Sequence, residues 1–280
     1  MRVPGGPADG RRSVPCYRAA VDPTARSDPF RPIDQPETGP LTAEWLGRAD
    51  YRSVWALQKE LAAARAVGEI GDRLLLVEHP AVLTLGRSSD EAHVRASTAE
   101  LADRAIEVIR VERGGEVTYH GPGQLVAYPI IALSRRGLLL RPLVRALEAA
   151  LVETCAAAGV VAGRREGHPG CWIDPDGVEP RKIGALGLRV ERGVSYHGIA
   201  LNVDPDLGDF ELIDACGMPD VVSTSIAREA GRPDEPPSTD AVAAAGAVFA
   251  RAFARGIGVA LEGFGAADRA PALPELAAVR

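Results

Sequence analysis

The fold prediction for this chain starts from the stretch Arg113-Gly114-Gly115-Glu116-Val117-Thr118-Tyr119-His120-Gly121-Pro122-Gly123-Gln124. Its four glycines and one proline exclude a packed helix. The apolar runs on either side, residues 106–111 and 125–131, have the pattern of strands. The sequence therefore predicts a glycine-rich ribbon between two strands. Its dense polar and aromatic side chains favour contact with a ligand, and a bulged β-hairpin with ordinary turn residues is the alternative.

Composition limits the class of protein. The 280 residues allow one large domain or two small ones, and 46% hydrophobic with 25% charged residues is typical of a soluble globular protein. A net charge of −6 argues against nucleic acid as the main partner. No apolar run approaches the ~20 residues of a membrane helix, and no secretory signal or transit peptide is recognisable. We expect a cytoplasmic monomer without a membrane partner.

The chain divides by composition into three parts. Residues 1–40 contain eight of the 22 prolines and little periodicity, which predicts a disordered arm. Residues 41–262 are expected to form a single domain. Residues 263–280 are rich in alanine and proline and are expected to be a frayed tail.

Hydrophobic periodicity predicts the elements of the domain. Helices are expected near residues 51–65 with a stop at Gly68, after Ser97, at 142–158 and at 241–255 with Ser238 or Thr239 as cap. Strands are expected at residues 74–77, 82–85, 106–111 and 125–131, with a hairpin of 182–190 and 194–203. Residues 204–215 are expected to be an irregular loop. This mixture predicts an α/β (α+β) domain with a mixed, largely antiparallel sheet flanked by helices.

Lysine is rare in this chain. Only two of the 32 basic residues are lysines, and the rest are arginines. Lys59 lies beside Glu60 on the polar face of a predicted helix and needs no special role. Lys182 lies among small and apolar residues. Because a desolvated lysine can lose its proton and act as a base, Lys182 is the better candidate for a function.

The four cysteines, Cys16, Cys155, Cys171 and Cys216, show no CxxC spacing and are expected to be thiols. Cys155 on an alanine-rich helix and Cys171 at a strand start are expected to be packed. Cys216 ends a polar loop, and the glycine after it would let backbone N–H groups approach an oxyanion. Cys216 is therefore the candidate nucleophile, with a partly buried loop thiol as the alternative.

A cysteine nucleophile needs a group that favours its thiolate. The pKa of a free thiol is about 8.5, so little thiolate exists at neutral pH without help. Lys182 or a histidine could give that help. His120 and His197 each occur in a Tyr-His-Gly sequence. The alternative for both is a structural role, and we favour that alternative for His197.

Five motifs in a fixed order carry a resemblance to a known family. They are Glu78-His79-Pro80 with Thr84-Leu85-Gly86-Arg87; Arg113-Gly114-Gly115 with Thr118-Tyr119-His120-Gly121-Pro122-Gly123-Gln124; Arg181-Lys182-Ile183 with Leu186-Gly187; His197-Gly198 with Ala200-Leu201-Asn202; and Cys216-Gly217 with Thr224-Ser225. Over about residues 41–230 the chain resembles the octanoyl-[acyl-carrier-protein]:protein N-octanoyltransferases, the lipoate biosynthesis protein B family.

The resemblance implies a fold, a reaction and a site. The fold is the biotin/lipoate protein ligase catalytic domain. The reaction moves an octanoyl group from acyl carrier protein to a lysine of lipoyl domains, such as those of 2-oxoacid dehydrogenase E2 subunits or the glycine cleavage H protein. Cys216 would carry the acyl thioester, and Lys182 would lower its pKa and shuttle protons, without a cofactor or metal. The acyl pocket maps onto Arg113, Gly114, Gly115, Glu116, Val117, Thr118, Tyr119, His120, Ala185, Leu186, Gly187, Gly198, Ile199 and Ala200.

Two departures from the family pattern and three alternatives stand beside this prediction. Ala215 replaces the proline usual before the cysteine, and Cys171 stands where valine or a similar residue is expected. The alternatives are an ATP-dependent lipoate or biotin ligase on the same fold, a non-catalytic acyl-binding protein, and a zinc site that includes Cys171 and Cys216. The cysteine and histidine spacing fits no zinc motif.

Overall fold

We analysed a computed structural model, which describes residues 36–214, 221–232 and 238–263. Most of the predicted arm and tail therefore lies outside the described residues. So do Cys16, Ala215 and Cys216.

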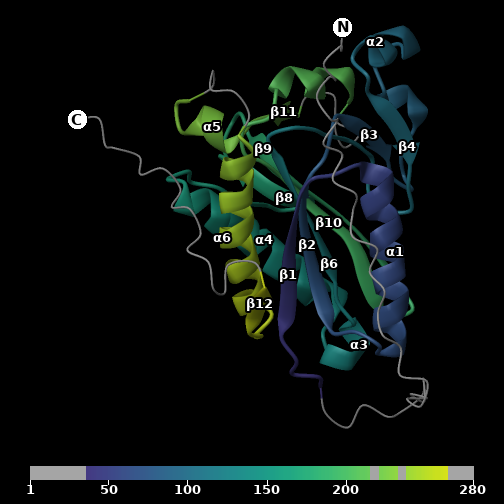
Figure 1. Cartoon of the computed structure of the whole chain (residues 1–280). Coiled ribbons are helices and arrows are strands. Elements are labelled where there is room, and N and C mark those ends of the chain that lie inside the picture. Colours follow the sequence, from purple (N-terminus) through teal and green to yellow (C-terminus); the bar gives the residue numbers. More distant parts are fainter. Residues whose placement is uncertain (1–35, 215–220, 233–237, 264–280) are drawn as a thin grey trace, which may run out of the picture. The chain divides into compact units, whose positions relative to one another are not determined.

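A large sheet forms the centre of the fold (Figure 1). Its strands, in spatial order, are β12 (Leu261–Gly263), β1 (Leu41–Arg48), β2 (Asp72–Glu78), β6 (Gln124–Ile130), β10 (Val194–Asn202), β9 (Arg181–Glu191), β8 (His168–Ile173) and β7 (Gly163–Arg165), with β11 (Val222–Ser223) paired to β9. The pairs β1–β12, β1–β2 and β9–β11 are parallel, and the others are antiparallel. The predicted mixed, largely antiparallel sheet is confirmed.

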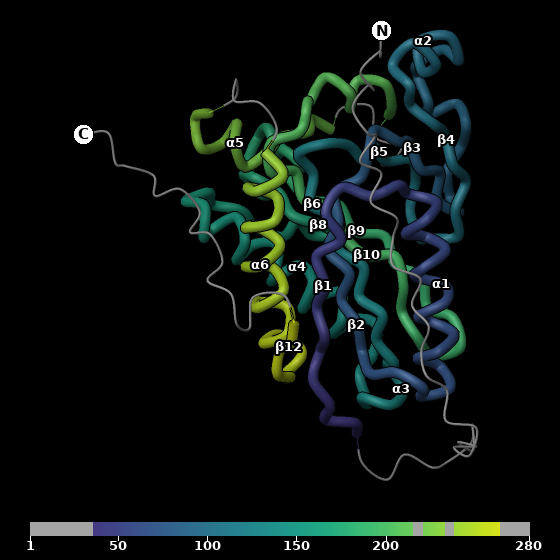
Figure 2. The backbone as a smooth tube through the Cα atoms, in the orientation of Figure 1, coloured from purple at the N-terminus to yellow at the C-terminus, as the bar shows by residue number. Residues whose placement is uncertain are grey.

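A small sheet, in the order β4–β3–β5, adjoins one end of the large sheet (Figure 2). It consists of β3 (Val82–Leu85), β4 (Glu107–Arg110) and β5 (Val117–His120). The glycine-rich ribbon runs from β5, which pairs with β3, into β6, which pairs with β2 and β10. The alternative of a hairpin is therefore wrong, because the two strands that flank Gly121-Pro122-Gly123 join different sheets.

Helices cover both faces of the large sheet (Figure 1). The long ones are α1 (Tyr51–Val67), α4 (Leu140–Ala157) and α6 (Thr239–Gly256), and the short ones are α2 (Thr98–Asp103), α3 (Leu133–Arg136) and α5 (Ile226–Glu229), with 3₁₀ turns η1 (Glu91–His93) and η2 (Leu207–Leu212). Ser97 and Ser238 cap α2 and α6 as predicted, through hydrogen bonds to Glu100 N and Ala241 N. Gly68, with φ 85°, ends α1 in the left-handed conformation.

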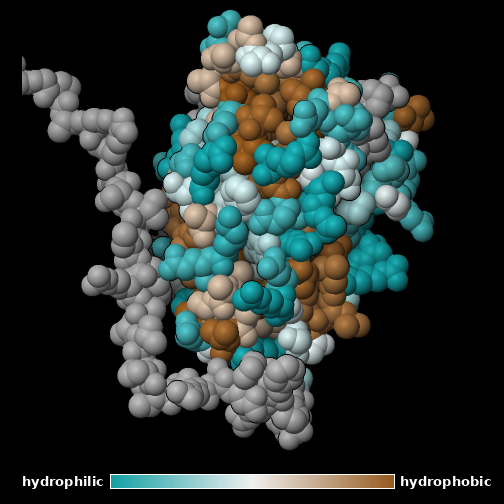
Figure 3. All heavy atoms as spheres, turned by 90° about the vertical axis from the view of Figure 1, so that its right-hand side faces the viewer, coloured by the Kyte–Doolittle hydropathy of each residue, from teal (hydrophilic) through white to brown (hydrophobic). Residues whose placement is uncertain are grey.

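The core lies in two layers. Apolar side chains of α4 and α6, such as Leu147 and Phe249, pack on one face of the large sheet. The other face packs on α1 through residues such as Val54 and Tyr128. Figure 3 looks onto the side of the molecule that carries α1, where hydrophilic residues surround smaller hydrophobic areas.

Strands β1 and β12 are absent from the sequence prediction. In β1 only Leu41 and Ala43 are buried, so the strand lacks the apolar alternation that would reveal it. The predicted irregular loop before Cys216 contains η2. Gly263, assigned above to the tail, is the last residue of β12.

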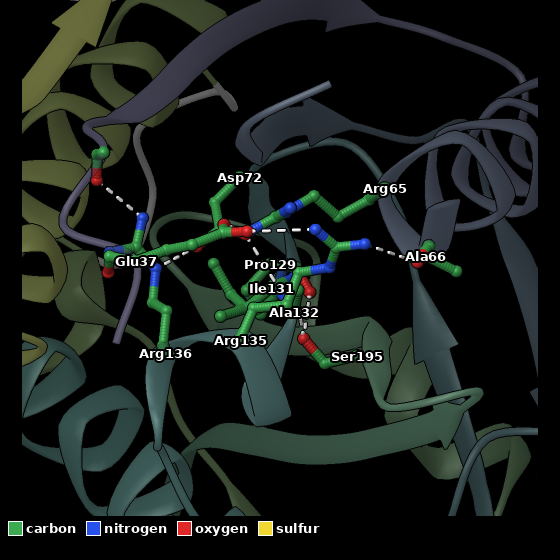
Figure 4. A network of polar contacts seen from close by, with 11 residues as sticks. Glu37, Arg65, Ala66, Asp72, Pro129, Ile131, Ala132, Arg135, Arg136 and Ser195 are labelled. Atoms are coloured by element: carbon green, nitrogen blue, oxygen red, sulfur yellow. Dashed lines mark hydrogen bonds and ion pairs between the residues drawn. The ribbon is translucent and has the colours of Figure 1, made fainter. Parts of the chain in front are cut away.

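Ion pairs join the residues before β1 to the sheet (Figure 4). The carboxylate of Asp72 accepts hydrogen bonds from Arg65 Nε at 2.6 Å, from Ala132 N at 3.1 Å and from Arg136. Glu37 pairs with Arg65 and, at 3.1 Å, with Arg135. Burial alone would raise the pKa of Glu37, but the two arginines lower it. The charged form of Glu37 is therefore favoured within this network.

Candidate active site

A pocket lies between the small sheet and the end of the large sheet. Four strands and the start of α1 build it: β5 from the small sheet, and β6, β9 and β10 from the large one. Its lining residues are Tyr51, Arg113, Gly115, Glu116, Val117, Thr118, His120, Val126, Tyr128, Lys182, Ala185, Leu186, Gly187, His197, Gly198, Ile199 and Ala200.

Most of the predicted pocket residues line this cavity, but Gly114 and Tyr119 do not. Side chains alternate along β5, so Tyr119 faces away from the pocket, into the apolar cluster that packs on the small sheet. There its hydroxyl donates to Asp209 Oδ2 at 2.6 Å. The N–H of Gly114 donates to Leu188 O at 2.9 Å and so ties the ribbon to β9. These two residues hold the wall in place. Cys216 lies outside the described residues.

Glycines let backbone segments approach each other closely around the pocket: the ribbon and β9 in one place, and the paired strands β10 and β6 in another. A Cβ at Gly187 would lie 2.8 Å from Gly114 O. A Cβ at Gly198 would lie 2.0 Å from Ala127 O, which is closer than any side chain tolerates. Backbone therefore forms a large part of the pocket wall, as the glycine content of these motifs predicts.

Lys182 lies at the rim of the pocket on β9. Its side chain is only 8% exposed, and Nζ lies 5.1 Å from the centre of the Trp172 ring. A Cβ at Gly170 would lie 3.4 Å from Lys182 Cε, so the aliphatic part of the lysine passes over this glycine. Lys182 is therefore buried beside a glycine and an aromatic ring, and its functional role stays a prediction.

The described chain on both sides of the Cys216 segment is anchored. Before the segment, Asp214 N donates to His93 O at 2.8 Å. After it, β11 pairs with β9 so that Ser223 is opposite Lys182, and Thr224 N donates to Lys182 O at 2.9 Å. The chain that leaves the segment thus runs directly beside Lys182.

Arg113 holds the ribbon onto β3. Its guanidinium is buried and donates to Thr84 O at 2.6 Å, to Thr84 Oγ1 at 2.9 Å and to Glu116 O at 2.7 Å. These contacts occupy N–H groups of the guanidinium that could otherwise bind a ligand. In this structure Arg113 therefore shapes the pocket wall.

Two neutral histidines support the floor of the pocket. His120 Nδ1 donates to Gln124 Oε1 at 2.7 Å, because the amide of Gln124 donates to Asn202 Oδ1. His79 Nδ1 donates to Ala49 O, so its Nε2 accepts the hydroxyl of Tyr128 at 2.9 Å. Burial lowers the pKa of His79 to about 4 and that of His120 to about 3. Both rings are thus uncharged at neutral pH.

Sequence reasoning missed Tyr51, Val126 and Tyr128 and assigned a structural role to His197. Tyr51 is distant in sequence from every other wall residue, and no local signal marks it. Val126 and Tyr128 belong to a strand recognised only by its apolar run. For His197 a signal existed, since Tyr196-His197-Gly198 repeats the Tyr-His-Gly sequence of the ribbon.

Metal sites and membrane-spanning helices are not seen in the described ranges. Within them, no three His, Cys, Asp or Glu side chains gather as a metal ion would require. None of the helices described there has the length and apolar character needed to cross a lipid bilayer.

Comparisons with known proteins identify relatives of this chain. The sequence profile of the lipoyl protein ligase A/B catalytic domain matches residues 50–248. The octanoyltransferase of Corynebacterium efficiens is 41% identical over 90% of this chain and 99% of its own length. That of Chloroflexus aurantiacus is 48% identical over 69% of this chain and 85% of its own.

Solved structures of lower identity share the fold. A bipartite lipoate protein ligase of Thermoplasma acidophilum superposes with a TM-score of 0.55 at 16% identity, over 80% of this chain and 86% of its own. LipL1 of P. falciparum, in complex with lipoate, gives a TM-score of 0.57 at 10% identity, over 80% of this chain and 66% of its own. The predicted ligase-like catalytic fold is therefore confirmed.

Proposed function

Because the chain belongs to the octanoyltransferases of the lipoyl protein ligase A/B catalytic-domain family, we propose that it carries an octanoyl group on Cys216, from acyl carrier protein to a lysine of a lipoyl domain. Octanoyl transfer in lipoate biosynthesis is the activity that the family membership supports. One observation supports the finer mechanism above all. Lys182 lies buried at the rim of the pocket, and the strand that follows the Cys216 segment pairs beside it.

The first step transfers the acyl group to the enzyme. The thiolate of Cys216 attacks the thioester carbonyl of octanoyl-acyl carrier protein, the new carbon–sulfur bond forms, and the phosphopantetheine thiolate leaves. Lys182 takes the proton from Cys216 and returns it to the leaving thiolate. One thioester replaces another of similar energy, so this step needs no ATP and no metal.

The second step transfers the acyl group to the acceptor. The neutral amine of the acceptor lysine attacks the acyl-cysteine, an amide bond forms and the Cys216 thiolate leaves. Lys182 takes a proton from the attacking amine and passes it to Cys216. Lipoyl domains of 2-oxoacid dehydrogenase E2 subunits and the glycine cleavage H protein are the proposed acceptors, and no cofactor takes part.

An arginine-lined hollow beside this rim is the proposed docking surface of the donor. Its four arginines are Arg141 and Arg145 from α4 and Arg164 and Arg165 from β7. Arg165 Cζ lies 5.2 Å from the ring of Trp172, and Lys182 Nζ lies 5.1 Å from the same ring. Acyl carrier protein is acidic as a class, so these charges would hold it with its acyl group close to Lys182.

The test is the intact mass of the protein after mixing with octanoyl-acyl carrier protein in the absence of ATP. We expect one octanoyl adduct on the wild type, removed by hydroxylamine and passed to a lipoyl domain. Cys216→Ala should form no adduct. Lys182→Arg keeps the charge but is not a base, so transfer should fall by about 10²–10⁴-fold. Lys59→Arg is the matched control and should act as the wild type.

Other outcomes would overturn this function. Transfer that appears only with ATP and free fatty acid would indicate a ligase. Tight acyl binding without any adduct would indicate a binding protein. Near-normal turnover in Lys182→Arg would remove the proton-shuttle role from that lysine.

A further inference from the structure

We infer that Arg165 binds the phosphate group of the phosphopantetheine arm that carries the acyl donor, and so holds the arm with its thioester beside Lys182. The inference rests on the proposed function, because it assigns a binding site to one chemical group of the proposed donor. Three features support it: an aromatic ring that contacts both Arg165 and Lys182, a guanidinium without an acidic partner, and the charge of the hollow around it.

The indole of Trp172 brings Arg165 and Lys182 close together. It is fully buried, and its Nε1 donates to His168 O at 3.0 Å, so the ring is held in one orientation. Trp172 is opposite Lys182 in the pairing of β8 with β9. Arg165 Cζ lies 5.2 Å from the centre of the ring, and Lys182 Nζ lies 5.1 Å from it. The separation of Cζ and Nζ therefore cannot exceed the sum of these two distances.

The guanidinium of Arg165 has no acidic partner among the residues that the structure describes. The other arginines on that side of the hollow do: Arg145 lies 3.3 Å and Arg164 lies 3.8 Å from the carboxylate of Glu148. Arg165 is half-buried, with its guanidinium over the Trp172 ring. An arginine placed over an aromatic ring keeps N–H groups for other acceptors. Arg165 is therefore available to bind an anion.

The phosphate is the only charged group of the donor's arm. Between it and the thioester, the pantetheine unit contains neutral amides and a hydroxyl group. The phosphate is also the one charge of the donor that is tied to the thioester by a chain of fixed length. The extended arm is longer than the separation of Lys182 and Arg165, so its phosphate reaches Arg165 when the thioester lies beside Lys182. A planar guanidinium matches two phosphate oxygens with paired N–H donors.

The charge of the hollow around Arg165 suits a phosphodiester. Four arginines and three acidic residues line it, which leaves an excess of one positive charge when its histidine is neutral. A phosphodiester carries one negative charge at neutral pH. Arg141 lies in the first turn of α4, which contains no acidic residue, so the positive end of the helix dipole adds to the same field. An anionic group of single charge therefore balances this hollow.

The experiment compares two small donors that differ only in the phosphate, octanoyl-pantetheine and octanoyl-phosphopantetheine. For each, kcat/KM of transfer to a lipoyl domain is measured at low salt without ATP. The wild type should prefer the phosphorylated donor about tenfold, as expected for one charge-assisted hydrogen bond. In Arg165→Gln the ratio of the two kcat/KM values should fall close to one. Arg165→Lys keeps the charge but loses the planar fork, so its ratio should lie between these values.

Two control variants separate this contact from general effects of charge. Arg251→Gln removes an exposed charge on α6, so its ratio should equal that of the wild type. Arg164→Gln removes the neighbouring arginine, whose charge already faces Glu148, so its ratio should change less than that of Arg165→Gln. An unchanged ratio in Arg165→Gln would overturn the inference. If that variant lost activity only with octanoyl-acyl carrier protein, Arg165 would contact the protein part of the donor and the inference would again be wrong.

A second measurement keeps the inference testable if no transfer occurs. Phosphopantetheine and pantetheine, both without an acyl group, are titrated into the Cys216→Ala protein and into the same protein with Arg165→Gln, and binding is followed by isothermal titration calorimetry. Phosphopantetheine should bind more tightly than pantetheine to the first protein, and the two should bind equally to the second. Equal binding of both compounds to the first protein would refute the role of Arg165, whereas absence of the acyl adduct in the wild type alone would refute only the proposed function.

Discussion

At the scale of the residue, burial decides the charge state of the groups around the pocket. His79 and His120 are both buried and both spend Nδ1 on a fixed acceptor, a backbone carbonyl for one and an amide oxygen for the other. Neither is suited to act as an acid at neutral pH. Lys182 is the pocket residue to which we assign proton transfer in the proposed function.

The lowered histidine pKa values predict a stability that depends on pH. The pKa of His79 falls through burial to about 4 in the fold, from an unfolded value near 6.5. Between these values the unfolded chain binds more protons, so the free energy of unfolding rises with pH and is lost as pH falls. From pH 7 to pH 4, His79 alone should cost about 3 kcal/mol.

Urea unfolding at pH 7 and at pH 5 measures this loss. His79→Gln keeps a donor and an acceptor but does not titrate, so its stability should change less over the same range. If the free energy of unfolding changed equally with pH in the wild type and in the variant, His79 would not be the group responsible.

At the scale of the element, the ribbon explains what sequence reasoning could predict and what it could not. The runs at 106–111 and 125–131 were recognisable as strands because both are rich in β-branched apolar residues, although Glu107 and Arg110 interrupt the first. β5 was hidden inside the glycine-rich stretch, so the alternation that turns Tyr119 away from the pocket and His120 toward it could not be seen. Tyr51 reaches the wall only through packing of α1 on β6 and β10, which no local pattern encodes.

The contact between β10 and β6 predicts a strict requirement for glycine at position 198. A Cβ there would lie 2.0 Å from Ala127 O, and backbone on a central strand cannot move away freely. Gly198→Ala should lower the free energy of unfolding by about 1–3 kcal/mol and narrow the pocket. Urea unfolding and octanoyl adduct formation are the measurements.

Gly71→Ala is the matched control, because nothing lies within 4 Å of the Cβ that it would add. Its stability should stay within about 0.5 kcal/mol of the wild type. If Gly198→Ala were equally harmless, the strands would have to be further apart than the structure shows.

At the scale of the whole molecule, charge is unevenly placed. The chain carries a net charge of −6, yet the hollow next to Lys182 is lined by four arginines, against three acidic residues, Glu148, Glu166 and Asp176. Within it, Glu148 is buried and lies 3.3 Å from Arg145 and 3.8 Å from Arg164, so part of the positive charge is already neutralised. Arg141 and Arg165 are the better candidates for contact with an acidic partner.

Reversing these two charges should weaken the docking of octanoyl-acyl carrier protein and leave the acyl-transfer step unchanged. Arg141→Glu with Arg165→Glu should lower kcat/KM for octanoyl-acyl carrier protein about tenfold or more at low salt, and high salt should reduce the difference. Octanoyl-pantetheine lacks the protein part, so its kcat/KM should not change.

Arg251→Glu, an exposed charge change on α6, is the control and should resemble the wild type with both donors. If kcat/KM of the double variant fell equally for octanoyl-acyl carrier protein and for octanoyl-pantetheine, the defect would lie in the pocket. If kcat/KM fell for neither donor, acyl carrier protein would have to dock on another surface.

The small sheet occupies one continuous segment of the chain, from the end of β2 at Glu78 to the start of β6 at Gln124. Those two strands are themselves paired neighbours, with Val77 opposite Val126. One wall of the pocket is therefore a continuous insertion whose two ends are adjacent, and the opposite wall belongs to the large sheet. Grafting residues 79–123 from a relative would exchange one half of the pocket as a cassette while β9, β10 and Lys182 stay in place.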